Sequence, residues 1–209
     1  MNKRSPRPAP SRATLPIMAA YIALVYVPFT VYVLTSDYDV VRVSISAIAW
    51  QRGNLPMIIL YATLTLPFLL WQIAFFLSFN TLAKKALIGP LLVGCLALGT
   101  GIVFPSPPTG LASALHRTFS QIGAIMIIIA VTIVVVRLFA NTRQARPGLT
   151  LSLAIVYGIA TLSIAGLFIV IGSPAALEVG SSLFYMVCLF VVNLAQARAH
   201  RVTETQGNL

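Results

Sequence analysis

The chain alternates between long apolar runs and short polar intervals. Six apolar runs cover residues 15–34, 55–79, 86–104, 119–136, 149–172 and 177–194. An α-helix of about 17–25 apolar residues is long enough to cross the hydrocarbon core of a bilayer, which is about 30 Å thick. The pattern therefore predicts an all-α polytopic membrane protein, with a six-transmembrane-helix bundle over residues 15–195.

The flanks of this bundle and its first loop show other patterns. Residues 1–14 are rich in Pro, Ser and Arg and poor in apolar side chains, so we expect a disordered basic tail there. Residues 196–209 are polar and are expected to form a second tail. In the first loop, apolar and polar residues alternate over 41–46, which fits either a short strand or an interfacial helix.

Proline and small residues within the runs predict local features of the helices. Pro67 lies in the middle of the second run and should kink that helix, because proline removes one backbone hydrogen bond. The third run contains Ala97 and Gly101, and the fifth contains Gly158, Thr161 and Ala165. Small residues let helix backbones approach closely in a bilayer. We therefore expect both the third and the fifth helix to make close contacts with neighbours.

Composition supports the membrane interpretation and excludes a soluble domain. Hydrophobic residues make up 58% of the chain, charged residues only 9%, and the mean hydropathy is +0.93. A soluble domain is roughly half apolar and a quarter charged. The net charge of +10 could suggest nucleic acid, but the basic residues fall in short clusters between apolar runs and form no basic face. We expect no nucleic-acid partner.

The distribution of Lys and Arg predicts the orientation. Of the 14 Lys and Arg residues, only Arg42, Arg52 and Arg117 fall on the side opposite the two termini. Lys and Arg are retained on the cytoplasmic side of a membrane. The sequence therefore predicts a multi-pass protein of the plasma or inner membrane with both termini in the cytoplasm. Asp37, Asp39, Glu178 and His116 then lie at the extracytoplasmic end.

The interval between the third and fourth runs holds His116, one of only two histidines in the chain. Imidazole changes its charge near neutral pH, so His116 could act as a base or a ligand, or could simply lie at the interface. The first loop contributes Asp39, Ser44 and Ser46 on the same side. An Asp, a Ser and a His on one side could form a hydrolytic triad, although no GxSxG motif surrounds either serine.

Glu178 opens the sixth run and is a further candidate catalytic carboxylate. It could instead pair with Arg117 or His116, or complement the positive end of its own helix. Residues expected to bind a ligand share a place in the two extracytoplasmic loops or next to them. They are Phe104, Pro105, His116, Arg117, Ser120, Asp37 and Arg42.

No metal site or cofactor is expected. The chain has no HExxH or CxxC motif and no phosphate-binding loop, and Cys95 and Cys188 each lie inside an apolar run. No acidic or basic residue lies in the middle of a run, which argues against a proton pump or an ion-coupled carrier.

These features together resemble a largely prokaryotic six-span family, the domain of unknown function numbered nine-nine-eight. The resemblance rests on the Ser-Ile-Ser at residues 44–46, on Phe104 and Pro105 before His116, and on Glu178. The chain departs from the family pattern at Val179, where an Arg is frequent, and in lacking a Gly after the Ile-Ser. The family is distantly similar to the eukaryotic Frag/DRAM/Sfk group. This implies a bacterial inner-membrane protein and a link to lipid-anchor remodelling or membrane homeostasis.

Three functions remain open from the sequence. The first is binding of a membrane lipid or another membrane protein at the extracytoplasmic end. The second is a membrane enzyme acting on a lipid headgroup or acyl ester, with His116 as the base. The third is transport of a small neutral solute, which needs no charge in the middle of the membrane. Binding is favoured, because only one group that titrates near neutral pH is available outside.

Overall fold

The computed structural model describes residues 13–35, 38–51, 53, 55–79, 83–104, 110–142 and 147–207. Within these ranges the regular structure is entirely helical. The helices are α1 (Thr14–Tyr21), η1 (Ile22–Tyr26), α2 (Val27–Leu34), α3 (Ile45–Gln51), α4 (Leu55–Phe79), α5 (Lys84–Val103), α6 (Leu111–Thr142), α7 (Pro147–Ile171) and α8 (Ala175–Gly207).

Six helices in the described part of the chain are long and apolar enough to cross a membrane. α1, η1 and α2 form one of them, over Thr14–Leu34, and the other five lie within α4, α5, α6, α7 and α8. The predicted all-α fold with six spans is therefore confirmed. The orientation in the membrane stays a prediction, and residues 1–12 of the expected N-terminal tail lie outside the described residues.

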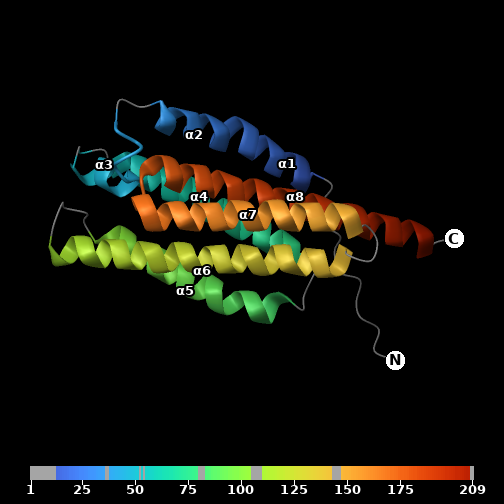
Figure 1. Ribbon diagram of the computed structural model, residues 1–209. Coiled ribbons are helices and arrows are strands. Elements are labelled where there is room, and N and C mark those ends of the chain that lie inside the picture. Colours follow the sequence, from blue (N-terminus) through green and yellow to red (C-terminus); the bar gives the residue numbers. More distant parts are fainter. Residues whose placement is uncertain are drawn as a thin grey trace.

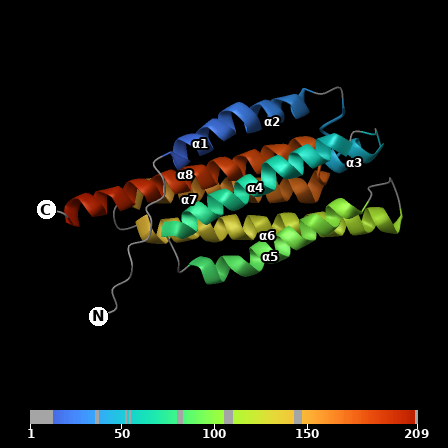
Figure 2. The same ribbon diagram turned by 180° about the vertical axis from the view of Figure 1, so that it is seen from behind.

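The helices lie roughly side by side in an elongated bundle (Figure 1). α1 and α2 form one edge, α5 forms the opposite edge, and α4, α6, α7 and α8 lie between them (Figure 2). We call the end that carries α3 and the starts of α6 and α8 the α3 end. The other end, where α1 begins and α8 finishes, is called the terminal end.

Three boundaries differ from the prediction. α6 begins at Leu111 rather than at residue 119, so His116 lies inside the helix and not in the loop before it. α8 continues through Gly207, so the predicted polar tail is largely helical. The alternating segment of the first loop forms no strand among the described residues, and α3 starts at Ile45. Of the two alternatives for this loop, the helix is therefore the one observed, over Ile45–Gln51.

Two hydrophobic clusters hold the bundle together. The larger one runs along its length and joins α1, η1, α4, α6, α7 and α8 around side chains such as Phe76 and Met186, both of which are fully buried. The smaller one lies at the α3 end and joins α2, α3, α4 and α8 around Val33, Ile48 and Val179. A short helix such as α3 is marginal by itself in water, so burial in this second cluster is what stabilises it.

The first span departs from a regular α-helix just before Pro28. η1 is a π-helical segment over Ile22–Tyr26. Proline has no N–H to donate to the preceding turn, and π-bulges are a common response to a gap of this kind in the hydrogen-bond ladder. The segment directs the Tyr26 hydroxyl to Thr65 Oγ1 at 3.2 Å and to the Ser182 hydroxyl, which ties the first span to α4 and α8.

α5 and α6 form the closest helix pair, and glycines make their approach possible. A Cβ atom added at Gly123 would lie 2.5 Å from Leu98 Cγ and 3.0 Å from the Leu98 backbone nitrogen. One added at Gly101 would lie 2.8 Å from Ser120 Oγ. The expected close contact of the third span is therefore confirmed at Gly101.

α7 packs loosely against the rest of the bundle. A Cβ atom added at Gly158 would meet nothing within 4 Å, and Ala165 is exposed. The expectation that the small residues of the fifth span mark a close helix contact is therefore wrong at these positions. Glycine is frequent in transmembrane helices generally, so its presence does not identify which face has a neighbour.

Candidate functional site at the α3 end

His116 holds the end of α5 in place. Its side chain is 4% exposed, and Nδ1 lies 2.7 Å from the carbonyl oxygen of Gly101 and 3.1 Å from that of Phe104. Both partners are acceptors, so Nδ1 must carry the proton and donate to them. The last carbonyl groups of a helix have no partner within the helix, and His116 supplies one for the end of α5.

Residues next to His116 reinforce the same contact between the two helices. The rings of Phe104 and Phe119 stack with their centroids 6.0 Å apart and an interplanar angle of 4°. Ser120 packs directly against Gly101. Arg117 is exposed, and its Nε donates to the Ser113 carbonyl of its own helix at 3.4 Å. Pro105, the remaining expected ligand-binding residue of this loop, lies outside the described residues.

Ser44 and Ser46 belong to the start of α3. Ser44 Oγ accepts the Ala47 backbone N–H at 3.2 Å, so Ser44 is the N-cap of α3. Its hydroxyl also forms a hydrogen bond of 3.1 Å with the Ser46 hydroxyl. Both side chains are half-buried. The Ser44 hydroxyl is therefore used to stabilise a helix terminus.

Glu178 joins α8 to α3 through a reciprocal set of hydrogen bonds. Its Oε2 accepts the Ile45 backbone N–H at 3.0 Å. In the opposite direction, the N–H groups of Ala175 and Ala176 donate to the carbonyls of Val43 and Val40 at 2.8 and 2.9 Å. α8 thus supplies an acceptor for the first N–H of α3, and the turn before α3 supplies acceptors for the first N–H groups of α8. The helix-end role considered for Glu178 extends to a second helix.

The described charged residues of the first loop, Asp39 and Arg42, lie on the surface. Asp39 and Arg42 are both exposed, and Arg42 Nε lies 3.7 Å from Asp39 Oδ2. An exposed ion pair of this kind contributes about 0–1 kcal/mol to stability. Asp37 lies outside the described residues.

The candidate catalytic residues form two separate groups. His116 Nδ1 donates to the end of α5, whereas Ser44 and Ser46 form hydrogen bonds within the start of α3, where Glu178 of α8 accepts the Ile45 N–H. Within the described ranges no hydrogen bond joins His116 to Ser44, Ser46, Asp39 or Glu178. The described part of the chain contains no group of three His, Cys, Asp or Glu side chains close enough to share a metal ion.

Sequence reasoning missed several residues that position these groups. Tyr61 donates its hydroxyl to the Glu178 carbonyl at 3.3 Å, and the carbonyls of Val40 and Val43 receive the first N–H groups of α8. Backbone carbonyls carry no residue-type signal, so the sequence could not identify them. Tyr61 lies within the second apolar run, where a tyrosine is not distinctive.

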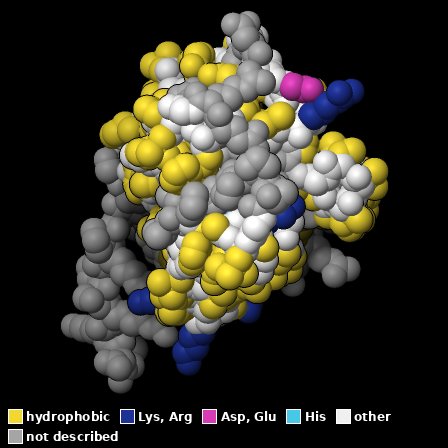
Figure 3. Space-filling model, turned by 90° about the vertical axis from the view of Figure 1, so that its left-hand side faces the viewer, with side chains coloured by type: hydrophobic (Ala, Val, Ile, Leu, Met, Phe, Trp, Pro, Cys, Tyr) yellow, Lys and Arg dark blue, Asp and Glu magenta, His cyan; other side chains and the backbone are white. Residues whose placement is uncertain are grey.

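The surface of the α3 end combines exposed apolar and cationic side chains. Val41 is 65% exposed, Leu111 is 76% exposed and Trp50 is 38% exposed. Arg42, which directly follows Val41, is exposed, and so is Arg117, which lies on the same helix as Leu111. Figure 3 views the molecule from this end, and hydrophobic side chains cover much of the described surface with basic ones among them. No histidine is visible on the described part of this face, in agreement with the burial of His116.

Two substitutions of His116 test its structural role at the end of α5. His116→Leu should lower the free energy of unfolding by about 1 kcal/mol, because it removes the donor that two carbonyls share. His116→Asn places an amide N–H near the position of Nδ1 and should retain most of that stability. Thermal unfolding of the purified protein in detergent measures both. Equal losses for the two variants would contradict the capping role.

Comparisons with protein-family models, with curated proteins and with solved structures find no match to this chain. The resemblance to the six-span family therefore rests on the residues quoted for it. Of these, Ser44, Ser46, His116 and Glu178 all lie at the α3 end, and all four make hydrogen bonds that hold helices there. The family assignment stays a prediction.

Proposed function

We propose that the protein is a multi-pass membrane protein that binds a membrane lipid or a partner membrane protein at its α3 end. The charge distribution along the chain favours this end as the extracytoplasmic one. The binding surface consists of the first loop with α3 and the exposed start of α6. Its role is recognition and not catalysis.

The observation that carries this proposal is the exposure of apolar and cationic side chains together at that end. Val41, Trp50 and Leu111 are exposed there, close in the sequence to Arg42 and Arg117. Tryptophan is enriched where a protein meets the lipid headgroups, because its ring has an apolar body and a polar N–H. Arginine pairs with phosphate in a bidentate geometry. This combination suits a phospholipid or the interfacial region of another membrane protein.

The same residues give the alternatives less support. A hydrolase would need the base within about 2.6–3.2 Å of a nucleophile or of its water, and His116 directs Nδ1 at the end of α5 instead. The Ser44 hydroxyl caps α3, and the Glu178 carboxylate binds a backbone N–H. Transport of a neutral solute is supported by none of these contacts, since each of them holds the end of a helix.

Replacing Trp50 tests the proposal. Trp50→Ala should weaken the retained lipid or partner about fivefold, the effect of losing roughly 1 kcal/mol of interfacial contact. Phospholipids are measured by mass spectrometry after mild detergent extraction, and protein partners by crosslinking in the native membrane. The two measurements distinguish lipid from protein.

Trp71→Ala provides the matched control. Trp71 is 37% exposed, which is close to the 38% of Trp50, but it lies in the second half of α4, away from the α3 end. It should leave retention at the wild-type level. The proposal fails if the two variants behave alike, or if the extracted protein carries neither lipid nor partner.

A further inference from the structure

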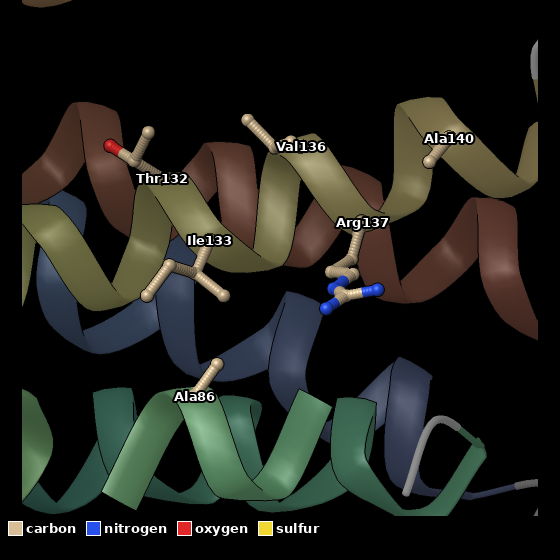
Figure 4. A pocket seen from close by; sticks show the side chains of 6 residues that line it. All are labelled: Ala86, Thr132, Ile133, Val136, Arg137 and Ala140. Atoms are coloured by element: carbon tan, nitrogen blue, oxygen red, sulfur yellow. The ribbon is translucent and has the colours of Figure 1, made fainter. Parts of the chain in front are cut away.

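A cleft of about 360 Å³ opens between α5 and α6 near the terminal end (Figure 4). Its lining consists of Ala86 from α5 and of residues from the second half of α6. These are Thr132, Ile133, Val136, Arg137 and Ala140.

The cleft follows from the way in which the two helices pack. Gly101 and Gly123 bring α5 and α6 into close contact toward the α3 end. From there α5 diverges from α6 toward the terminal end (Figures 1 and 2). Ile133 and Arg137 extend from α6 toward the turn of α5 that carries Ala86 (Figure 4). The opening faces the surroundings of the bundle, since Val136 is 55% exposed.

Most of the side chains that line the cleft are apolar. Ile133, Val136 and Ala140 offer only hydrocarbon. The hydroxyl of Thr132 forms hydrogen bonds of 2.8 Å with the Ile128 carbonyl and with the Tyr157 hydroxyl, so its polar atom is already used within the bundle. An acyl chain fits such a lining, whereas a soluble polar molecule does not.

We use the term rim for Arg137 of the cleft lining together with Lys84 and Lys85, which precede Ala86 in the sequence. Arg137 is exposed and lines the cleft, and Lys84 and Lys85 are exposed immediately before Ala86 at the start of α5. Among the described side chains the one ion pair joins Arg42 to Asp39 at the other end of the bundle. The chain has only four acidic residues; Glu178 also lies at the α3 end, and Glu204 belongs to the last turns of α8 and not to the α5–α6 pair. The rim therefore attracts an external anion.

We propose that this cleft binds an anionic phospholipid of the leaflet at the terminal end. The headgroup phosphate lies beside Arg137, Lys84 and Lys85, and one acyl chain follows Ile133 and Val136. A free anion would use the rim and leave the groove empty, and a neutral lipid would use the groove without the three cations. Basic pockets between transmembrane helices bind anionic headgroups in this manner. The site is distinct from the binding surface proposed at the α3 end.

Native mass spectrometry of the full-length protein, titrated in detergent with single lipids, tests the assignment. Phosphatidylglycerol should bind about tenfold more tightly than phosphatidylcholine. Arg137→Gln should weaken phosphatidylglycerol about fivefold and leave phosphatidylcholine unchanged, because one cation near a headgroup contributes about that factor. Ala86→Phe places a ring in the cleft and should weaken both lipids.

Arg198→Gln is the matched control. Arg198 is also exposed and also lies toward the terminal end, but it belongs to α8 and does not line the cleft. It should change phosphatidylglycerol binding by less than about twofold. Equal effects of Arg137→Gln and Arg198→Gln would overturn the proposal. So would displacement of the lipid by millimolar glycerol phosphate, which would indicate a site for soluble anions.

A second variant keeps the test decisive if Arg137→Gln does not yield folded protein. Lys84→Gln combined with Lys85→Gln changes only exposed side chains and should give at least the same loss for phosphatidylglycerol. An unchanged affinity in that double variant would contradict the role of the rim.

Discussion

Gly123→Ala is expected to lower the free energy of unfolding by about 1–3 kcal/mol relative to the matched variant Gly99→Ala. The new Cβ atom would lie 2.5 Å from Leu98 Cγ, 2.7 Å from Leu98 Cδ2 and 3.0 Å from the Leu98 backbone nitrogen. A contact with a backbone atom cannot be relieved by rotating a side chain. α5 and α6 must therefore move apart, and they lose contacts along the whole hairpin.

The comparison with Gly99→Ala isolates this clash. Replacing glycine by alanine inside a helix gains up to about 1 kcal/mol of helix propensity, and this gain applies at both positions. Gly99 lies on α5, is exposed, and a Cβ atom there would meet nothing within 4 Å. Thermal or denaturant unfolding in detergent gives the difference. If the two variants are equally stable, the helices are not as close as the structure has them.

The membrane fold was readable from the sequence because its signal is long and simple. Each span is a run of apolar residues about as long as a bilayer is thick, and few other structures tolerate such a run. The boundaries were less readable. Residues 111–118 include Ser113, His116 and Arg117, and these polar residues hid the first turns of α6. The helix continues through them, and His116 donates to the Gly101 carbonyl of α5 while Arg117 donates to the Ser113 carbonyl of α6 itself.

Irregularities within the helices were visible only in part. The π-helical segment before Pro28 was not predicted, although proline is a common cause of irregular turns in helices. Gly101 and Gly158 look alike in the sequence, yet only Gly101 lies against a neighbouring helix. The difference depends on which face of each helix is covered, and the hydrophobic pattern carries little of that information when every face is apolar.

The residues of the candidate site were identifiable, but their partners were not. Ser44, His116 and Glu178 were notable because polar side chains are rare at the ends of these spans. Their partners are mainly backbone groups, namely the N–H groups of Ala47 and Ile45 and the carbonyls of Gly101 and Phe104. A sequence pattern cannot specify such groups, since every residue has them. The same three side chains therefore suggested catalysis, whereas in the fold they form hydrogen bonds with free backbone groups at helix ends.

Glu178 is the residue of the α3 end whose replacement should have the largest effect. Glu178→Ala should lower the free energy of unfolding by about 1–3 kcal/mol, because it leaves the Ile45 N–H without its acceptor at the edge of an apolar cluster. When the carboxyl is ionised, the substitution also removes a negative charge from the positive N-terminal ends of both α3 and α8. α3 depends on this contact, since it is too short to be stable by itself.

The two effects can be separated by a neutral variant and by a local measurement. Glu178→Gln keeps an oxygen that accepts the Ile45 N–H and should lose at most about 1 kcal/mol, the contribution that the carboxyl makes when it is ionised. Asp39→Asn, in an exposed ion pair at the same end, should change stability by less than about 0.5 kcal/mol.

Hydrogen–deuterium exchange of residues 45–51 should rise strongly in Glu178→Ala, slightly in Glu178→Gln and not at all in Asp39→Asn. Unaltered exchange of α3 in Glu178→Ala would show that the contact between α3 and α8 holds without the carboxylate, and Glu178 would then be available for binding or chemistry at this end.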